Sequence, residues 1–286
     1  ALISAVIPPS YGSLATTVRR NLGAVRNTGW EALLSTQIVQ TEALGFDLTV
    51  SASTNANKLL TLGGTPPQIG VTTRVVEGYP LFGFWGRKIS GWEDRNGDGI
   101  LTYNADPALN EVFVDDEASF IGYNQPRHTV TTTAGFDLFR RVLRVQGMFD
   151  WRGGHYWYNN TERIRCVSRA NCNGLMNPDA SFEEQAMVVA TRDHPSRTVA
   201  GFIQKGDFLR FREMSLALRV PERFAAAMRA SSAQLVVTAR NLAVWTDYRG
   251  IDPETDRQAG PASDFPDEFQ TFGPPSTLIV RLSVGF

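Results

Sequence analysis

One loop of the sequence carries oxygen-bearing side chains at a spacing that suits a calcium ion. Its candidate ligands are Asp94, Asn96, Asp98 and the backbone carbonyl of Ile100. They stand at the first, third, fifth and seventh positions of a calcium-binding loop, and Gly99 allows the tight turn. The twelfth position, which usually supplies a bidentate Glu, is Ala105, so Asp106 would have to substitute. The sequence predicts a weak structural calcium site, with the alternative that these residues only form turns.

Aromatic and polar side chains further along the chain can contact a solute. Three aromatic residues follow one another at Tyr156, Trp157 and Tyr158, shortly after Trp151. Such rings either stack on the sugars of a substrate or form the aromatic girdle at a membrane interface, which is the better interpretation for Trp151. Alternate polar positions just before them hold further candidate substrate contacts, namely Arg144, Gln146, Asp150 and Arg152.

No residue pattern indicates an enzyme. His128, His155 and His194 lie in separate segments, and none stands beside a matched Ser or Cys nucleophile. Hydrolase and metalloprotease motifs are missing from the sequence, so we expect no catalytic residues. The formal net charge of −1 carries no basic excess, which argues against nucleic acid as a partner.

The two cysteines, Cys166 and Cys172, are close together in a polar stretch. Two thiols at this spacing in a loop can form a small disulfide, which would indicate an oxidising compartment such as the periplasm or the cell surface. The alternative is a pair of free thiols. We expect the disulfide, because surface geometry usually accommodates such a bridge.

The elements that position these residues show a strong period of two. The final segment, 278–286, alternates apolar residues with polar or small ones and ends on Phe286. Apolar rows that alternate with polar rows are typical of transmembrane barrel strands, in which one face meets lipid and the other meets water. Counting all such segments predicts about nine strands, at 30–38, 46–53, 69–76, 81–90, 129–138, 143–152, 208–220, 235–245 and 278–286. The alternation slips near Arg212, which indicates a β-bulge, and 221–232 is the one predicted helix.

The lengths of the connections support a membrane barrel. Long segments, 91–127, 159–206 and 250–276, alternate with short links at 41–45, 139–141 and 221–233. Outer-membrane barrels have short periplasmic turns and long extracellular loops. The predicted fold is therefore all-β, an antiparallel transmembrane β-barrel present here as a partial barrel of meandering strands with long extracellular loops.

Five blocks of the sequence resemble the closing part of SusC/RagA-type TonB-dependent outer-membrane transporters. In family order, the blocks are 21–31, 78–86, 94–99, 201–221 and 239–254. The resemblance implies a barrel of 22 strands with an amino-terminal plug, of which residues 1–286 would be the carboxyl-terminal part. About nine strands cannot close such a barrel, and the chain does not begin with Met, so we expect a fragment that does not transport alone.

The resemblance also implies location, cargo and partners. It places the chain in the outer membrane of a Gram-negative bacterium, in contact with lipid, and implies import of oligosaccharides or peptides with a SusD-like surface lipoprotein. The TonB-ExbB-ExbD complex would act through the missing amino-terminal region. Phe286 resembles the signal that the barrel assembly machinery reads, or is a lipid-facing anchor.

Two other functions remain open at this stage. A secreted, calcium-dependent, carbohydrate-binding β-sandwich would use the same period of two, but it would bury its apolar rows between two sheets. An outer-membrane enzyme on a barrel scaffold would need a nucleophile and a base on one face, and the sequence offers neither.

Overall fold

A computed structural model gives the structure of the protein. It describes residues 2–6, 10, 17–21, 23–227, 229–256 and 267–286. Most of the described elements are β-strands, and the described helices include none with the length and apolar composition needed to cross a membrane. The fold is therefore all-β, as the sequence predicts.

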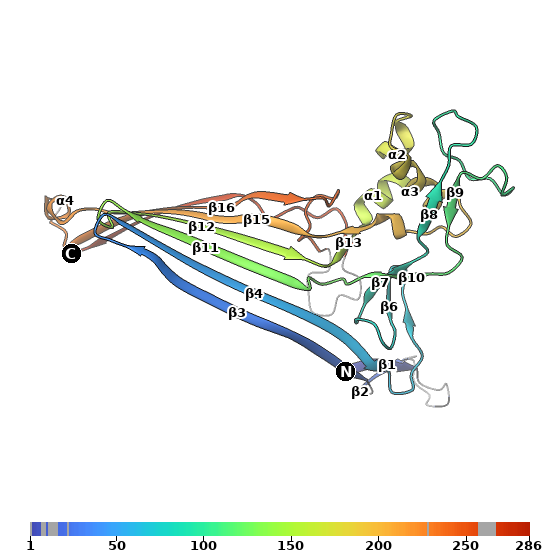
Figure 1. Cartoon of the computed structure of the whole chain (residues 1–286), viewed down its shortest axis with the longest axis horizontal. Helices are drawn as coiled ribbons and strands as arrows, with labels where there is room; N and C mark the ends of the chain where they lie inside the picture. The colour runs from blue at the N-terminus through green and yellow to red at the C-terminus, as the bar shows by residue number, and fades with distance from the viewer. Residues whose placement is uncertain (1, 7–9, 11–16, 22, 228, 257–266) are drawn as a thin grey trace.

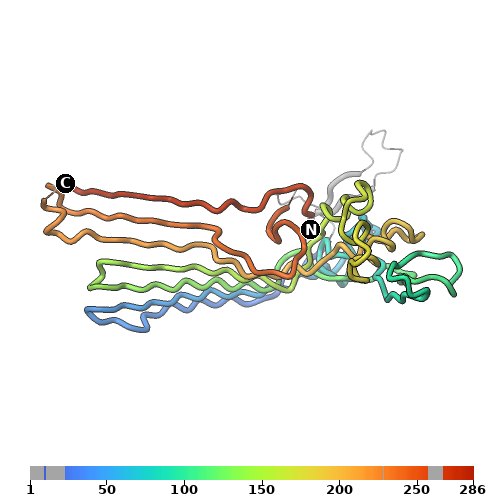
Figure 2. Tube along the Cα trace, turned by 90° about the horizontal axis from the view of Figure 1, so that it is seen from above, coloured from blue at the N-terminus to red at the C-terminus, as the bar shows by residue number. Residues whose placement is uncertain are grey.

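The main element is a single sheet of seven antiparallel strands (Figure 1). From one edge to the other the strands are β18 (Thr277–Gly285), β16 (Ser232–Thr246), β15 (Phe208–Arg219), β12 (Leu143–Gly153), β11 (His128–Leu138), β4 (Leu44–Thr61) and β3 (Ala24–Gln40). Figure 2 shows this sheet as one curved layer whose first and last strands lie apart. The sheet is open, as expected of a partial barrel.

Two of the predicted strands belong elsewhere. Residues 69–76 and 81–90 contribute short strands to small sheets. The main sheet, which we call the wall, therefore has seven strands, compared with the nine predicted. The small sheets contain β5 (Gln68–Ile69), β6 (Thr73–Val75), β7 (Gly83–Gly86) and β10 (Ser119–Gly122), then β8 (Ile89–Trp92) and β9 (Val112–Val114), then β13 (Tyr156–Asn159), β14 (Ile203–Lys205) and β17 (Asp267–Glu268), and lastly β1 (Leu2–Val6) and β2 (Thr17–Asn21). Runs of two to five residues are too short to cross a bilayer, which takes about 9–11 residues per strand.

All three long connections leave the sheet at the same end. The short links lie at the other end, together with the carboxyl terminus (Figure 1). We call the structure at the long-loop end the outer body, formed by residues 62–127, 154–207, 247–256 and 267–276. The predicted difference between the two ends is confirmed.

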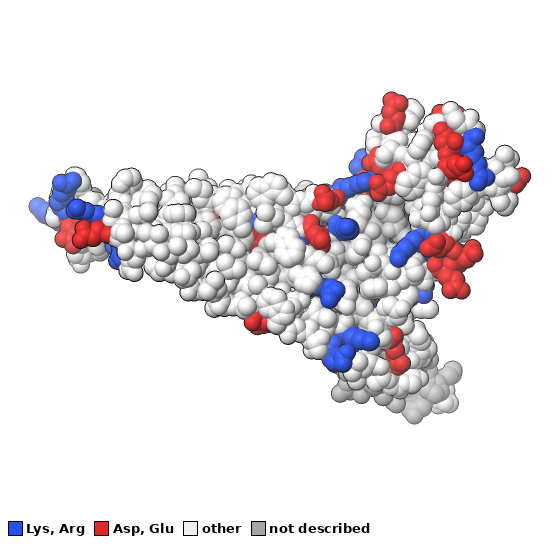
Figure 3. All heavy atoms as spheres, viewed as in Figure 1, with Lys and Arg blue, Asp and Glu red and all other residues white. Residues whose placement is uncertain are grey.

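The strand register places the apolar rows on one face. Val145 lies between Phe136 and Leu216, and Phe149 lies between Thr132 and Phe211. Across the seven strands as described, Lys and Arg occur on this face only at the outer end of β3 and β4, where Arg26 pairs in register with Lys58, and no Asp or Glu lies on it. Figure 3 shows the same pattern, because charged groups gather at the two ends and leave a broad, almost uncharged band over the strands.

The apolar face is not covered by a second layer in the described structure. Leu34 is 59% exposed, Phe136 is 41% exposed and Leu282 is 66% exposed. A β-sandwich would bury these side chains against another sheet. The structure therefore does not have the sandwich architecture that the alternative reading required.

The buried core lies in the outer body. One cluster joins Phe84, Tyr158, Phe202 and the two cysteines with residues of α3. The helices are α1 (Asn160–Val167), α2 (Asn173–Met176), α3 (Phe182–Arg192), the 3₁₀ turn η2 (Ala200–Phe202) and, at the short-link end, α4 (Glu222–Ala227). The sequence analysis predicted only the last of these. Ser181 accepts a hydrogen bond from the Glu184 amide at the start of α3, and this Ser-x-x-Glu spacing is the capping signal that could have revealed the helix.

A charge on the apolar face tests whether this face meets lipid. We expect Val145→Arg, in the complete protein, to destabilise the folded state in a bilayer by about 2–4 kcal/mol if this position lies near the membrane centre. The measurement is the folded fraction in lipid vesicles, read from the heat-sensitive mobility of the barrel in gels. The control is Gln146→Arg on the opposite face, and equal folding of the two variants would contradict the assignment of faces.

Candidate functional site

The polar face of the sheet ends in a cluster of six charged residues next to the outer body. They are Asp150, Arg152, Arg210, Arg212, Asp252 and Glu254. Arg210 donates from Nη2 to both carboxylate oxygens of Asp252, at 2.7 and 2.6 Å. Arg212 donates to Asp150 at 2.6 Å and to Glu254 at 2.6 Å. The three positive and three negative charges balance.

A β-bulge makes this arrangement possible. The register of β15 shifts between Phe211 and Glu213, so Arg212 is an extra residue without a partner position on the neighbouring strands. The bulge turns Arg212 to the polar face, beside Arg210, while Phe211 stays on the apolar face and stacks on Phe149. The irregularity predicted near Arg212 is confirmed.

The cluster holds residues 247–256 against the polar face. The side chains of Arg210 and Asp252 are only 4% and 7% exposed. Further along this segment, the Thr255 carbonyl accepts a hydrogen bond from the Trp157 indole. These contacts thereby attach a segment of the outer body to the polar face of the wall.

The other candidate substrate contacts on the polar face lie nearer the short-link end. Arg144 donates to Asp47 at 2.9 Å and to Asp137 at 3.0 Å, which joins three neighbouring strands. Gln146 faces the same side, because it pairs in register with Gly135 and Ser215. Arg144 and Asp137 also line a hollow of about 440 Å³. These positions suit a water-filled interior.

The predicted aromatic candidates have different surroundings. Trp151 is on the apolar face, 37% exposed, between Val130 and Leu209, where a girdle residue belongs. Tyr156 is half-buried. Trp157 and Tyr158 are 7% and 6% exposed, since they pack inside the outer body, so their rings offer no face to a solute. The sequence analysis did not anticipate this burial.

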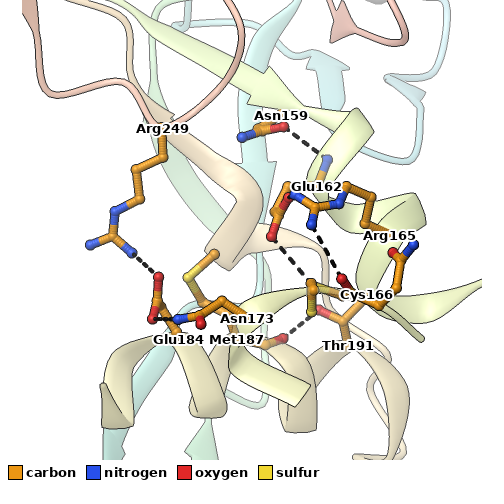
Figure 4. Close-up of a disulfide and its surroundings, with 11 residues drawn as sticks. Asn159, Glu162, Arg165, Cys166, Asn173, Glu184, Met187, Thr191 and Arg249 are labelled. Carbon is orange, nitrogen blue, oxygen red and sulfur yellow. Dashed lines mark hydrogen bonds and ion pairs between the residues drawn. A yellow bond between two sulfur atoms is a disulfide. The ribbon is translucent and has the colours of Figure 1, made fainter. Parts of the chain in front are cut away.

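Cys166 and Cys172 are joined in a disulfide (Figure 4). It links the end of α1 to the residue before α2, and both cysteines are buried in the core beside Met187 of α3. Glu162 lies close to both sulfurs, but bonded sulfurs offer no thiolate to a metal ion. Arg249, which lines the same cavity as Cys166, pairs with Glu183 of α3 at 3.0 Å, and this pair ties the 247–256 segment to the helix.

The acidic loop is ordered by its own side chains. Asp94 accepts hydrogen bonds from the Gly97 and Gly99 amides, and Asp98 accepts from the Ile100 amide and from the Asn96 side chain. Asp106 accepts from the Ala108 amide in a separate turn. Among the described residues, Asp94, Asp98 and Asp106 do not bring their carboxylate oxygens within 4.8 Å of one another. Calcium binding stays a prediction, and in the described structure Asp106 lies in a turn of its own, apart from the other candidate ligands.

Two buried side chains that the sequence analysis missed support this loop. Glu111 is 2% exposed and accepts hydrogen bonds from the Arg95 and Thr102 amides on either side of the loop. Burial raises the pKa of Glu111, but the hydrogen bonds from Thr102 and the loop amides outweigh burial and lower the pKa overall. Gln185 of α3 donates to the Gly99 carbonyl and accepts from the Leu101 amide.

The histidines lie in separate places. His128 pairs in register with Gly153 at the outer end of the wall. His155 is 2% exposed, and burial lowers its pKa to about 4 against the opposing charge of Asp207. His194 follows α3, and burial, helped by the charge of Arg87, lowers its pKa. Phe286 is 91% exposed at the end opposite the outer body.

Comparisons with known proteins agree with this architecture. No protein-family model matches the chain. The chain is 23% identical over 285 residues to "TonB-dependent receptor P26" of Formosa agariphila, covering 88% of this chain and 28% of the relative. It is 22% identical over 272 residues to "TonB-dependent receptor P3" of the same organism, covering 86% of this chain and 27% of the relative.

Solved structures share the fold. The chain superimposes on a chain of the RagAB peptide importer in its closed-closed state with a TM-score of 0.74 and 18% identity, covering 100% of this chain and 32% of that chain. For the open-open state the TM-score is 0.71, also with 18% identity, covering 100% of this chain and 31% of that chain. The chain thus spans about a third or less of the proteins it matches. The resemblance to SusC/RagA-type TonB-dependent transporters is confirmed, and the matched relatives are described as receptors and importers.

Removing one buried arginine tests the attachment of the 247–256 segment. We expect Arg210→Met in the complete protein to destabilise this segment by about 3–5 kcal/mol, because Asp252 is left buried without its cation. Hydrogen exchange of the 247–256 amides measures the change. Arg240→Met is the control: its exposed pair with Glu213 contributes at most about 1 kcal/mol. Equal protection of these amides in both variants would contradict the attachment of the 247–256 segment through Arg210 and Asp252.

The calcium prediction can be tested with a matched pair of variants. We expect the complete protein to bind calcium with a dissociation constant on the order of 10⁻⁴–10⁻³ M, as exposed extracellular sites do. Asp98→Ala removes a ligand and abolishes binding, whereas Asp106→Ala leaves it unchanged. Calorimetric titration of calcium measures both. Heat of binding that survives Asp98→Ala would show that this loop is not the site.

Proposed function

We propose that residues 1–286 form the carboxyl-terminal wall and outer loops of a TonB-dependent transporter in the outer membrane of a Gram-negative bacterium. The observation that carries this proposal is the sheet itself, because its register separates an exposed apolar face, charged only at Arg26 and Lys58 at its outer end, from a polar face in all seven strands. Such a sheet suits a barrel wall between lipid and a water-filled interior. Similarity to curated TonB-dependent receptors along most of the chain supports the same function.

The wall and the loops contribute differently to transport. The polar face lines the route with ion pairs and hydroxyl groups, and the outer body lies over the mouth of that route. The cargo we propose is an oligosaccharide or a peptide, and the solved relatives are described as peptide importers. The proposed partners are a SusD-like lipoprotein at the outer body, the barrel assembly machinery acting at Phe286, and the TonB-ExbB-ExbD complex acting on a plug outside this chain.

Two substitutions on the polar face test the assignment of the route. Arg144→Ala leaves Asp47 and Asp137 without their shared cation, so we expect slower uptake of anionic cargo and faster uptake of cationic cargo. Gln146→Ala changes the surface of the route without changing its charge. Uptake by whole cells expressing the complete protein is measured with labelled cargo of either charge, corrected for surface level.

Thr132→Ala is the control for this experiment, since it removes a hydroxyl from the apolar face. We expect normal assembly for all three variants and unchanged uptake only for the control. Unchanged uptake in both polar-face variants would contradict the proposed route.

A further inference from the structure

A cavity in the outer body is lined by positively charged side chains and by no acidic side chain. It has a volume of about 160 Å³ and lies between β6, β7 and the 196–199 segment that follows α3. Arg74, Arg87 and Arg197 line it, and no Asp or Glu does. A water molecule occupies about 30 Å³ in the liquid, so the cavity has room for a small polyatomic ion.

The three segments around the cavity are fixed to one another. The Trp85 amide donates to the Thr72 carbonyl at 2.8 Å, and the Thr198 hydroxyl donates to the Arg87 carbonyl at 2.7 Å. Gly86 allows a close approach here, because a Cβ atom at this position would lie 2.9 Å from the Cβ of Ala200. The cavity is therefore a built part of the fold.

The three guanidinium groups differ from the arginines of the polar face. Arg144, Arg210 and Arg212 each have carboxylate partners. Within the part of the chain that the structure describes, none of the three cavity arginines has an acidic group within ion-pairing distance. Their positive charges repel one another until an anion enters.

Trp85 adds a second feature that suits a ligand. The Arg74 guanidinium lies 5.3 Å from the centre of the Trp85 ring, so the ring holds this cation at the cavity. The Trp85 indole nitrogen is buried and has no acceptor among the described residues. A buried N–H group without an acceptor is costly, and Trp85 lines the cavity, so a ligand acceptor that reached this group would be favourable.

We propose that this cavity binds an oxyanion, such as a carboxylate or sulfate group, through Arg74, Arg87 and Arg197. Guanidinium groups form paired hydrogen bonds to such anions, which makes arginine more selective than lysine here. Arg87 and Arg197 are exposed, so the anion enters from solvent. The anion is either free in solution or an acidic group on transported cargo, and the chemistry of recognition is the same.

The test measures binding to the complete protein in non-ionic detergent, which does not require transport. Inorganic sulfate is titrated at constant ionic strength, and binding is followed by calorimetry. We expect saturable binding that weakens about tenfold in Arg74→Gln and in Arg197→Gln, since each removes a charge-assisted hydrogen bond. Arg169→Gln is the matched control, because Arg169 is exposed and lies outside the cavity.

The outcomes separate the sources of the anion. Tighter binding of a trigalacturonate than of sulfate, lost in the same two variants, assigns the site to acidic cargo. Equal or weaker binding of the trigalacturonate, with sulfate binding still lost in the variants, assigns it to a free anion. No saturable binding of either probe, or the same loss in Arg169→Gln, would overturn the proposal, and neither result bears on whether the protein transports.

Discussion

The structure depends on the rule that backbone polar groups in hydrocarbon must find partners within the protein. The sheet satisfies this rule at five of its seven strands, which have neighbours on both sides. It leaves the outward edges of β3 and β18 without a neighbour among the described strands. An edge of this kind is costly in lipid and prone to pairing with other chains in water. In the proposed barrel, further strands pair with both edges. The need for these strands follows from the hydrogen bonding of the backbone in lipid and does not depend on the similarity to known transporters.

The same sheet explains why the buried core lies in the outer body. Side chains on the wall meet lipid or water, so they do not pack against a second layer, and folding there relies on strand pairing. The outer body instead buries Phe84, Phe202 and the disulfide between its helices and small sheets. It also contains Glu111 and Gln185, which tie the acidic loop to α3. The two regions are therefore stabilised differently. Strand pairing stabilises the wall, which is exposed on both faces, whereas a packed interior stabilises the outer body.

This difference sets what the sequence could predict. The faces, the turns and the bulge at Arg212 were predicted correctly. The alternation of apolar and polar residues is local, so the sequence of each strand is enough to show which side chains share a face. The long 159–206 segment was expected to be a loop, yet it contains α1 and α3. The pairing of Arg210 with Asp252 could not be predicted, because it joins residues 42 positions apart through a loop whose path depends on tertiary packing. Burial of Trp157 was missed for the same reason, since a run of aromatic residues looks alike in a girdle and in a core.

The wall and the 247–256 segment behave as one unit. Separating them would expose the buried Arg210–Asp252 pair, break the bonds from Arg212 to Glu254, and remove the acceptor of the Trp157 indole. These contacts would have to break together, because the pair, the Arg212 bonds and the indole bond all join the same segment to the wall or to the outer body. Arg249 adds a further tie to α3, whose core contains the disulfide. In the transporter proposed above, we therefore expect the motions that admit cargo to keep these contacts, with the segment and the wall moving together or with the movement in parts of the protein outside this chain.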